Sequence, residues 1–356
     1  MQRLFSNAVA IIIGVAVAVG VAASYLIAQT NSLAPREIPA RRLPVPTTVS
    51  PELQQVIGAP LRQNWDMPPA TAAAWRELAA ALLAGARPNV DAMRNRLRVN
   101  VEPGTLAGVR VFTVTPQEIS TENRRRLVIQ IHGGCYVLNP AEAGLTEALL
   151  ISAFGRYKVI AVDYRMPPDA YFPAALDDAM AVWKAATRTN DPARMALIGT
   201  SAGGALVLEM VLRAKQERLP LPAAIASGTP MSDITGAGDS FQTNELVDNV
   251  LVSPHGFCDA AARFYANGHD LRDPLLSPVY GDMRGFPPTI LTTGTRDLLL
   301  SNTVRVHRKL RQAGVEASLQ VYEGQAHANY ARDDRIPETK EAFEEIAAFF
   351  DKHLAR

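Results

Sequence analysis

Short apolar runs and longer helical stretches alternate along the chain from about residue 97 onward. Runs rich in β-branched residues predict buried strands at 127–134, 158–164, 195–201, 223–230, 288–297 and 317–324. An alternating segment at 108–116 predicts one further, half-buried strand. Intervening stretches predict helices at 142–153, 173–187, 202–217 and 302–313, and a last helix begins near residue 337. Apolar strands that alternate with helices predict an α/β fold with a mostly parallel sheet flanked by helices.

The N-terminal segment has a different pattern. Residues 8–28 carry no charge, and only two glycines and one serine stand outside the apolar class. At about 1.5 Å per residue, such a helix crosses a hydrocarbon core of roughly 30 Å. We therefore predict an N-terminal transmembrane segment within residues 1–30, with a cleaved signal peptide or a buried helix as alternatives. Basic residues flank the run on both sides, so the side of the membrane that holds the rest of the chain stays open.

Prolines are frequent between this apolar run and the first soluble helix. They predict an extended, Pro-rich tether at 31–70. A helical region at 71–96 follows, with Thr71 as its N-cap and Gly85 as the stop of its first helix. The alternating strand and helix pattern occupies 97–356, which we assign to a single large domain.

Charge and composition exclude several classes of partner. The chain has 356 residues, with 36 Lys and Arg against 35 Asp and Glu, which leaves a formal charge of +1. This balance leaves no surplus of positive charge to bind a polyanion, so we expect no nucleic acid partner. No metal-ligand motif, clustered Cys and His, or phosphate-binding glycine loop is present, so we expect no metal and no cofactor. Cys135 and Cys258 are the two cysteines, and one bridge between them stays open.

The pentapeptide Gly199-Thr200-Ser201-Ala202-Gly203 has the pattern G-x-S-x-G. It directly follows a predicted strand and directly precedes a predicted helix. A serine on such a sharp turn presents its hydroxyl at the edge of the sheet, with the positive end of the helix dipole beside it. We therefore predict Ser201 as a nucleophile. The alternative is a glycine-rich structural turn.

Serine needs a base to take its proton and an acid to orient that base. His327 lies in a loop after the last predicted strand, where it can reach Ser201. A loop histidine on its own is more often a surface residue, but this position favours the role of base. His307 lies within a predicted helix, His255 and His269 lie in the long excursion after the strand at 223–230, and His353 is near the chain end.

Asp297 ends the predicted strand at 288–297, thirty residues before His327, and the resulting order Ser, Asp, His is the one expected on an α/β-hydrolase sheet. Three other acids are weaker. Asp273 and Asp282 precede the strand, while Asp334 follows the histidine and breaks the order. As an alternative, Asp297 caps the helix at 302–313.

Acyl transfer also needs donors for the oxygen that becomes negative in the intermediate. The run His132-Gly133-Gly134-Cys135 follows a predicted strand, and the backbone N–H groups of Gly133 and Gly134 fit this role. Ala202, directly after the nucleophile, is expected to supply another donor. We interpret His132 as structural, with a second base as the alternative, and Cys135 as part of the loop, with a catalytic thiol as the alternative.

Together these motifs resemble the α/β-hydrolase fold, and within it the hormone-sensitive-lipase-like esterases, over residues 97–356. The resemblance rests on HGGCY at 132–136, DYRMPPDAYFPAALDD at 163–178, GTSAGG at 199–204 and DPLLSP at 273–278. It implies a helical lid over an acyl pocket, formed by N-terminal helices within 50–95, chiefly those of the 71–96 region, and by an insertion at about 231–268.

Two positions depart from the family pattern. Cys135 stands where the family most often has a third glycine, and Thr200 replaces the usual aspartate beside the nucleophile. We expect both changes to tune the activity and not to abolish it. The insertion contains apolar residues, which favour uncharged esters of short to medium acyl length: Phe241, Leu246, Phe257 and Tyr265.

The sequence thus favours a membrane-tethered serine carboxylesterase that acts on a small-molecule ester. An amidase, lactonase or deacetylase on the same triad is the alternative among enzymes. A ligand receptor or a membrane scaffold on the same fold is the alternative outside them. The sequence leaves both a monomer and a homodimer open.

Overall fold

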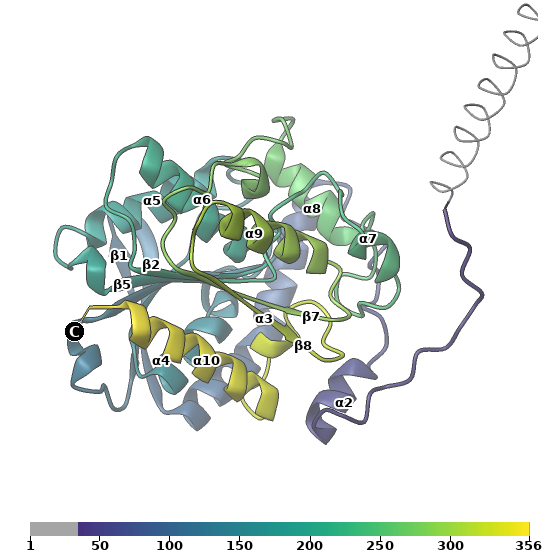
Figure 1. Cartoon of the computed structure of the whole chain (residues 1–356), viewed down its shortest axis with the longest axis horizontal. Coiled ribbons are helices and arrows are strands. Elements are labelled where there is room, and N and C mark those ends of the chain that lie inside the picture. The colour runs from purple at the N-terminus through teal and green to yellow at the C-terminus, as the bar shows by residue number, and fades with distance from the viewer. Residues whose placement is uncertain (1–34, 356) are drawn as a thin grey trace, which may run out of the picture. The chain divides into compact units, whose positions relative to one another are not determined.

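The computed structural model describes residues 35–355 (Figure 1). The chain divides into two units, residues 1–44 and 45–356, and the described part of the first carries neither helix nor strand. The predicted transmembrane segment at 8–28 lies outside the described residues. Within residues 35–355, no helix is both long and apolar enough to cross a bilayer.

The second unit is built on one eight-stranded sheet with the strand order β1-β2-β4-β3-β5-β6-β7-β8. Strands β3 to β8 are parallel to one another, while β2 is antiparallel to both β1 and β4. The mostly parallel sheet predicted from the alternating pattern is confirmed. The strands are β1 (Val99–Leu106), β2 (Val109–Pro116), β3 (Leu127–Ile131), β4 (Lys158–Val162), β5 (Met195–Thr200), β6 (Ala224–Gly228), β7 (Thr289–Gly294) and β8 (Ala317–Tyr322).

Helices cover both faces of this sheet (Figure 1). One face carries α5 (Ala174–Ala186), α6 (Ala202–Gln216) and α9 (Leu300–Gln312), and the other carries α4 (Thr146–Gly155) and α10 (Pro337–His353). The remaining helices are α2 (Pro51–Ile57), α3 (Ala72–Leu97), α7 (Ser240–Thr243) and α8 (Phe257–Ala266).

The strands are apolar on both sides because each side packs on a helical layer. Ile129 and Ile131 of β3 belong to the core on the α5 and α6 side, whereas Val128 belongs to the core on the α4 and α10 side. All three are fully buried. This alternation explains why the parallel strands appear in the sequence as continuous apolar runs.

The structure differs from the sequence predictions mainly before residue 107. Thr71 is the N-cap of α3, as predicted, but the helix continues through Gly85 to Leu97, so the predicted stop is wrong. Burial of Val90 and Met93 in the second half of α3 stabilises the helix beyond the glycine. The segment predicted to be extended contains helix α2. This helix forms because the Ser50 side chain caps its N-terminus and Leu53 is buried. Strand β1 was not predicted.

Candidate active site

Ser201 lies on the turn between β5 and α6, with φ 63° and ψ −122°. A non-glycine residue with these angles is strained and persists only where its surroundings hold it. The surroundings are tight, since a Cβ on Gly203 would lie 2.0 Å from the Ile131 carbonyl oxygen. The Ser201 backbone is also fixed at both ends, since its N–H donates to Gly228 and its carbonyl accepts from Met231. The sharp turn predicted from the pentapeptide is present.

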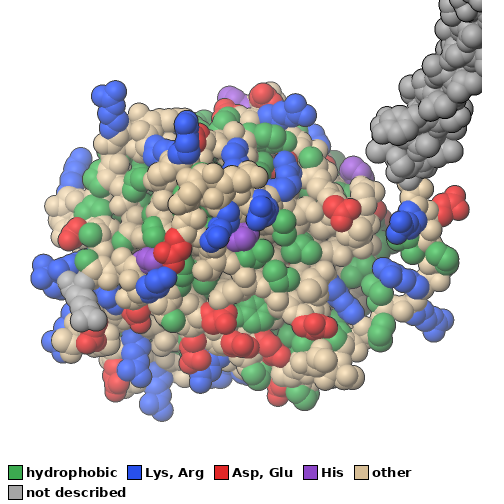
Figure 2. Space-filling view, viewed as in Figure 1, with side chains coloured by type: hydrophobic (Ala, Val, Ile, Leu, Met, Phe, Trp, Pro, Cys, Tyr) green, Lys and Arg blue, Asp and Glu red, His purple; other side chains and the backbone are tan. Residues whose placement is uncertain are grey.

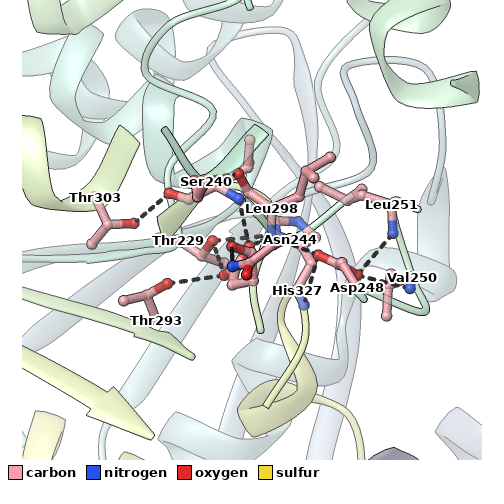
Figure 3. Close-up of polar contacts among 12 residues, drawn as sticks. Thr229, Ser240, Asn244, Asp248, Val250, Leu251, Thr293, Leu298, Thr303 and His327 are labelled. Atoms are coloured by element: carbon pink, nitrogen blue, oxygen red, sulfur yellow. Dashed lines mark hydrogen bonds and ion pairs between the residues drawn. The ribbon is translucent and has the colours of Figure 1, made fainter. Parts of the chain in front are cut away.

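His327 and Asp297 meet at the carboxyl ends of the neighbouring strands. The His327 Nδ1 lies 3.2 Å from Asp297 Oδ1. The Asp297 carboxylate also accepts the hydroxyl of Thr229, the hydroxyl of Thr293 at 3.0 Å and the N–H of Leu299 at 2.8 Å (Figure 3). Because a carboxylate can only accept, Nδ1 donates to it and Nε2 is left as the acceptor on the imidazole.

A second buried carboxylate, Asp248, supports the same loop and was not predicted from the sequence. It accepts four backbone N–H groups, from Val250, Leu251, Leu298 and His327 (Figure 3). Burial, together with the nearby Asp297 charge, raises the pKa of Asp248. Asp248 therefore links the backbone directly after Asp297 to the backbone of His327.

The loop after β3 lies against the nucleophile turn. A Cβ on Gly133 would lie 2.5 Å from the Thr200 carbonyl oxygen and 3.1 Å from the Ser201 Cβ. Among the described residues, none accepts a hydrogen bond from the backbone N–H groups of Gly133, Gly134 and Ala202. These three donors are therefore available to a bound oxyanion.

His132 is buried below this loop. Its Nδ1 donates to the Gly133 carbonyl oxygen at 2.8 Å, its ring stacks on Tyr164 with centroids 4.1 Å apart, and burial lowers the pKa of its imidazole. A neutral, packed imidazole that holds the loop agrees with a structural role.

Cys135 forms a disulfide with Cys258, across 123 positions of sequence. The bridge joins the loop after β3 to α8. Both cysteines are bonded, which is at odds with the alternative of a catalytic thiol at Cys135.

Thr200, the residue before the nucleophile, takes part in a buried polar cluster. Its hydroxyl lies 2.5 Å from Glu147 Oε1 and 2.7 Å from the Tyr330 hydroxyl. Burial raises the pKa of Glu147 to about 7. Thr200 replaces the aspartate that the family usually has beside the nucleophile, but the Glu147 side chain of α4 brings a carboxyl to the same place. No local motif in the sequence indicates this contact.

One cleft of about 520 Å³ brings the candidate residues together, since Ser201, His327 and the loop from His132 to Cys135 all line it. Asp297 is fully buried behind His327. The rival acids lie elsewhere: Asp282 pairs with Arg284, and Asp334 pairs with Arg96. Helix α3 forms another part of the wall, through Leu82, Ala86, Asn89, Val90 and Met93.

The four apolar insertion residues do not line this cleft. Phe241, Phe257 and Tyr265 are buried in the core, and Leu246 is 58% exposed. The preference for uncharged esters that was inferred from them therefore has no support in the cleft wall. Within residues 35–355, no group of three or more Cys, His, Asp and Glu side chains could hold a metal ion.

Comparisons with known proteins show what this chain is similar to. Residues 128–331 match the family model described as α/β hydrolase fold. The crystal structure of esterase E25 is 43% identical over 90% of this chain and 99% of its own, with a TM-score of 0.87. An esterase from the bacterial hormone-sensitive lipase family is 28% identical, with a TM-score of 0.73 over 86% of this chain and 99% of its own. An acetyl-hydrolase of Streptomyces hygroscopicus is 28% identical over 63% of this chain and 75% of its own.

Proposed function

Because this chain belongs to the hormone-sensitive-lipase-like esterases of the α/β-hydrolase fold and is a carboxylic ester hydrolase, we propose that it acts through Ser201, His327 and Asp297. Ser201 attacks the ester carbonyl while Nε2 of His327 removes its proton. Asp297 holds the imidazole in the tautomer that leaves Nε2 free. The protonated histidine then gives its proton to the alcohol oxygen as the ester C–O bond breaks, so the alcohol leaves and Ser201 stays acylated. Water, activated by the same histidine, then releases the acid from the acyl-enzyme.

The observation that carries this proposal is the pairing of His327 with Asp297, because His327 lines the same cleft as Ser201. In the intermediate, the carbonyl oxygen gains negative charge. The free N–H groups of Gly133, Gly134 and Ala202 supply the oxyanion hole. In other hydrolases, one such donor is worth about 3 kcal/mol in the transition state.

The preferred acyl groups are of short to medium length. A cleft of about 520 Å³ has room for a small ester, and one relative is named an acetyl-hydrolase. Helix α3 and the loop residues Val250 and Leu251 line one side of this cleft. Helix α8 packs against α3 through Phe257 and Trp75, whose ring centres lie 5.1 Å apart.

A chain-length series of p-nitrophenyl esters, run beside the matching anilides, tests this assignment. We expect the largest kcat/KM for acyl chains of a few carbons and much slower cleavage of the anilides. A maximum beyond about twelve carbons would contradict the acyl-length proposal. Anilide cleavage that matches ester cleavage would favour the amidase alternative, and no turnover of any substrate would favour a receptor or scaffold.

We further propose that residues 8–28 anchor the protein in a membrane, with cleavage as a signal peptide as the competing fate. Disulfides persist in oxidising compartments, so the Cys135–Cys258 bridge supports a catalytic unit outside the cytoplasm. Membrane fractionation with N-terminal mass analysis tests this proposal. Carbonate-resistant protein supports the anchor, a trimmed soluble product supports cleavage, and intact protein in the soluble fraction contradicts both.

A further inference from the structure

Two arginines stand on the wall of the candidate catalytic cleft. Arg62 lies in the segment between α2 and α3, and Arg332 directly follows the loop of His327. The Arg62 guanidinium lies 4.3 Å from the centre of the Phe257 ring, at the N-terminal end of α8. The two cations are close enough that the charge of Arg62 contributes to lowering the pKa of Arg332.

Arg332 has no partner in the part of the chain that the structure describes. No hydrogen bond or ion pair within residues 35–355 involves its guanidinium. Part of the Arg332 residue is exposed to solvent. The protein around it displaces water and so lowers the pKa of the guanidinium. Arginine nevertheless stays charged at neutral pH. The negative charge that raises the pKa of Arg332 is on Asp248, whose oxygens already accept four backbone N–H groups.

The charges on the rest of the cleft wall do not balance this pair. Glu147 is the one acidic residue among the described side chains that line the cleft, and burial raises its pKa to about 7. Its carboxyl is engaged with Thr200 and Gln130. The side of the cleft that holds Arg62 and Arg332 therefore carries a surplus of positive charge, and two neighbouring guanidinium groups favour an anionic ligand.

The position of Arg332 relates this field to one half of the substrate. His327 must give its proton to the departing oxygen, so the alcohol portion of the ester lies toward the His327 loop. Arg332 is five positions further along that loop, and Ala328 and Ala331 between them also line the cleft. The alcohol portion, and not the acyl group, is therefore the part that approaches the arginines.

We propose that Arg62 and Arg332 recognise a carboxylate on the alcohol portion of the substrate, so that the enzyme prefers esters with a small uncharged acyl group and an anionic leaving alcohol. This inference rests on the proposed function and adds the substrate class to it. A guanidinium with free N–H groups binds a carboxylate through two parallel hydrogen bonds, which gives orientation as well as affinity.

Two matched substrate pairs test the inference on the full-length enzyme. The first pair is para-acetoxybenzoate and its methyl ester, which differ in a charge on the alcohol side. The second pair is phenyl hemisuccinate and its methyl ester, which differ in a charge on the acyl side. We expect the ratio of kcat/KM, anionic over neutral, to exceed one for the first pair and to stay below it for the second.

Variants then assign the preference to the arginines. Arg332→Gln lowers the anionic-to-neutral ratio of the first pair by about tenfold, and Arg62→Gln lowers it in the same direction. Arg332→Lys restores part of it. The matched control is Arg335→Gln, because Arg335 is paired with Asp333 at the surface and leaves the ratio unchanged. The ratio is used because a general loss of folding or catalysis affects both esters alike.

Three results would overturn the inference. These are equal kcat/KM values for para-acetoxybenzoate and its methyl ester, a ratio that Arg332→Gln does not change, and a preference for the anionic member of the acyl-side pair instead. Failure of the proposed function looks different, because wild-type enzyme would then hydrolyse neither the charged nor the neutral ester.

Discussion

The two sides of the candidate active site are built in different ways. The nucleophile side is contiguous in sequence, because the end of β5, Ser201 and the start of α6 follow one another within a few residues. The acid and base side is assembled from distant segments, with Thr229, Asp248, Asp297 and His327 each on a separate loop. A local motif can therefore specify the nucleophile side. The acid and base side forms only when distant segments of the chain are correctly folded against one another.

The largest expected effect concerns the contiguous side. Ser201→Ala removes the nucleophile and should lower kcat for a p-nitrophenyl ester by on the order of 10⁵-fold or more, since related serine hydrolases lose about that much. Ser318→Ala on β8 is the matched control and should keep wild-type kcat, because no side-chain hydrogen bond of Ser318 exists within residues 35–355. Stopped-time product assays measure both, and near-normal turnover by Ser201→Ala would contradict the assignment.

The next effect concerns the assembled side. Asp297→Asn keeps the shape of the acid but lets the imidazole adopt the wrong tautomer, so kcat should fall by about 10³- to 10⁴-fold. Asp282→Asn tests the rival acid from the sequence and should leave kcat within about twofold, because Asp282 is a surface residue paired with Arg284. If Asp282→Asn gave the larger loss, the acid would be misassigned.

A smaller effect concerns the link between the loop beside Ser201 and α8. Removing the disulfide with Cys258→Ser should lower the free energy of unfolding by about 2–5 kcal/mol, because the bridge closes a loop of 123 positions. Chemical denaturation with and without a reductant measures the change. The Cys135→Ser and Cys258→Ser double variant is the control, and a reductant that destabilised it as much as wild type would show that the bridge is not responsible.

An effect on stability that is confined to one pH range concerns Glu147, beside the nucleophile turn. Its pKa is raised to about 7 by burial, so the folded protein holds a proton that the unfolded chain releases near pH 4.5. Between these two values stability therefore falls as pH rises, by about 3 kcal/mol in total. Glu147→Gln should remove this loss. Unfolding free energies at pH 5 and pH 8 measure it, and a pH dependence that survives the substitution would exclude Glu147 as its source.

The same contrast explains what could be predicted from the sequence. Ser201 and the glycines around it follow from a motif, and Asp297 and His327 follow from their place after strands. Thr229 and Asp248 could not be predicted, because their partners are 68 and 79 positions away and no spacing rule relates them. Thr229 does end a predicted strand, which is the one signal that could have suggested it.

The fold shows a similar limit. The buried parallel strands are visible as apolar runs, but β1 is mostly exposed and carries a Pro-Gly pair, so it has neither an apolar run nor a regular alternation. Its pairing with β2 supplies what the local pattern lacks. Helix α3 passes Gly85 because contacts with the body of the protein outweigh the cost of about 1 kcal/mol for a glycine.

We expect an ester to acylate Ser201, with His327 as the base and Asp297 as the acid that orients it. The most direct measurement is to react the intact enzyme with a fluorophosphonate and to locate the adduct by peptide mass spectrometry. We predict a single adduct on Ser201, absent from Ser201→Ala and formed much more slowly in His327→Ala. An adduct on any other residue, or none in an enzyme that still hydrolyses esters, would contradict the account.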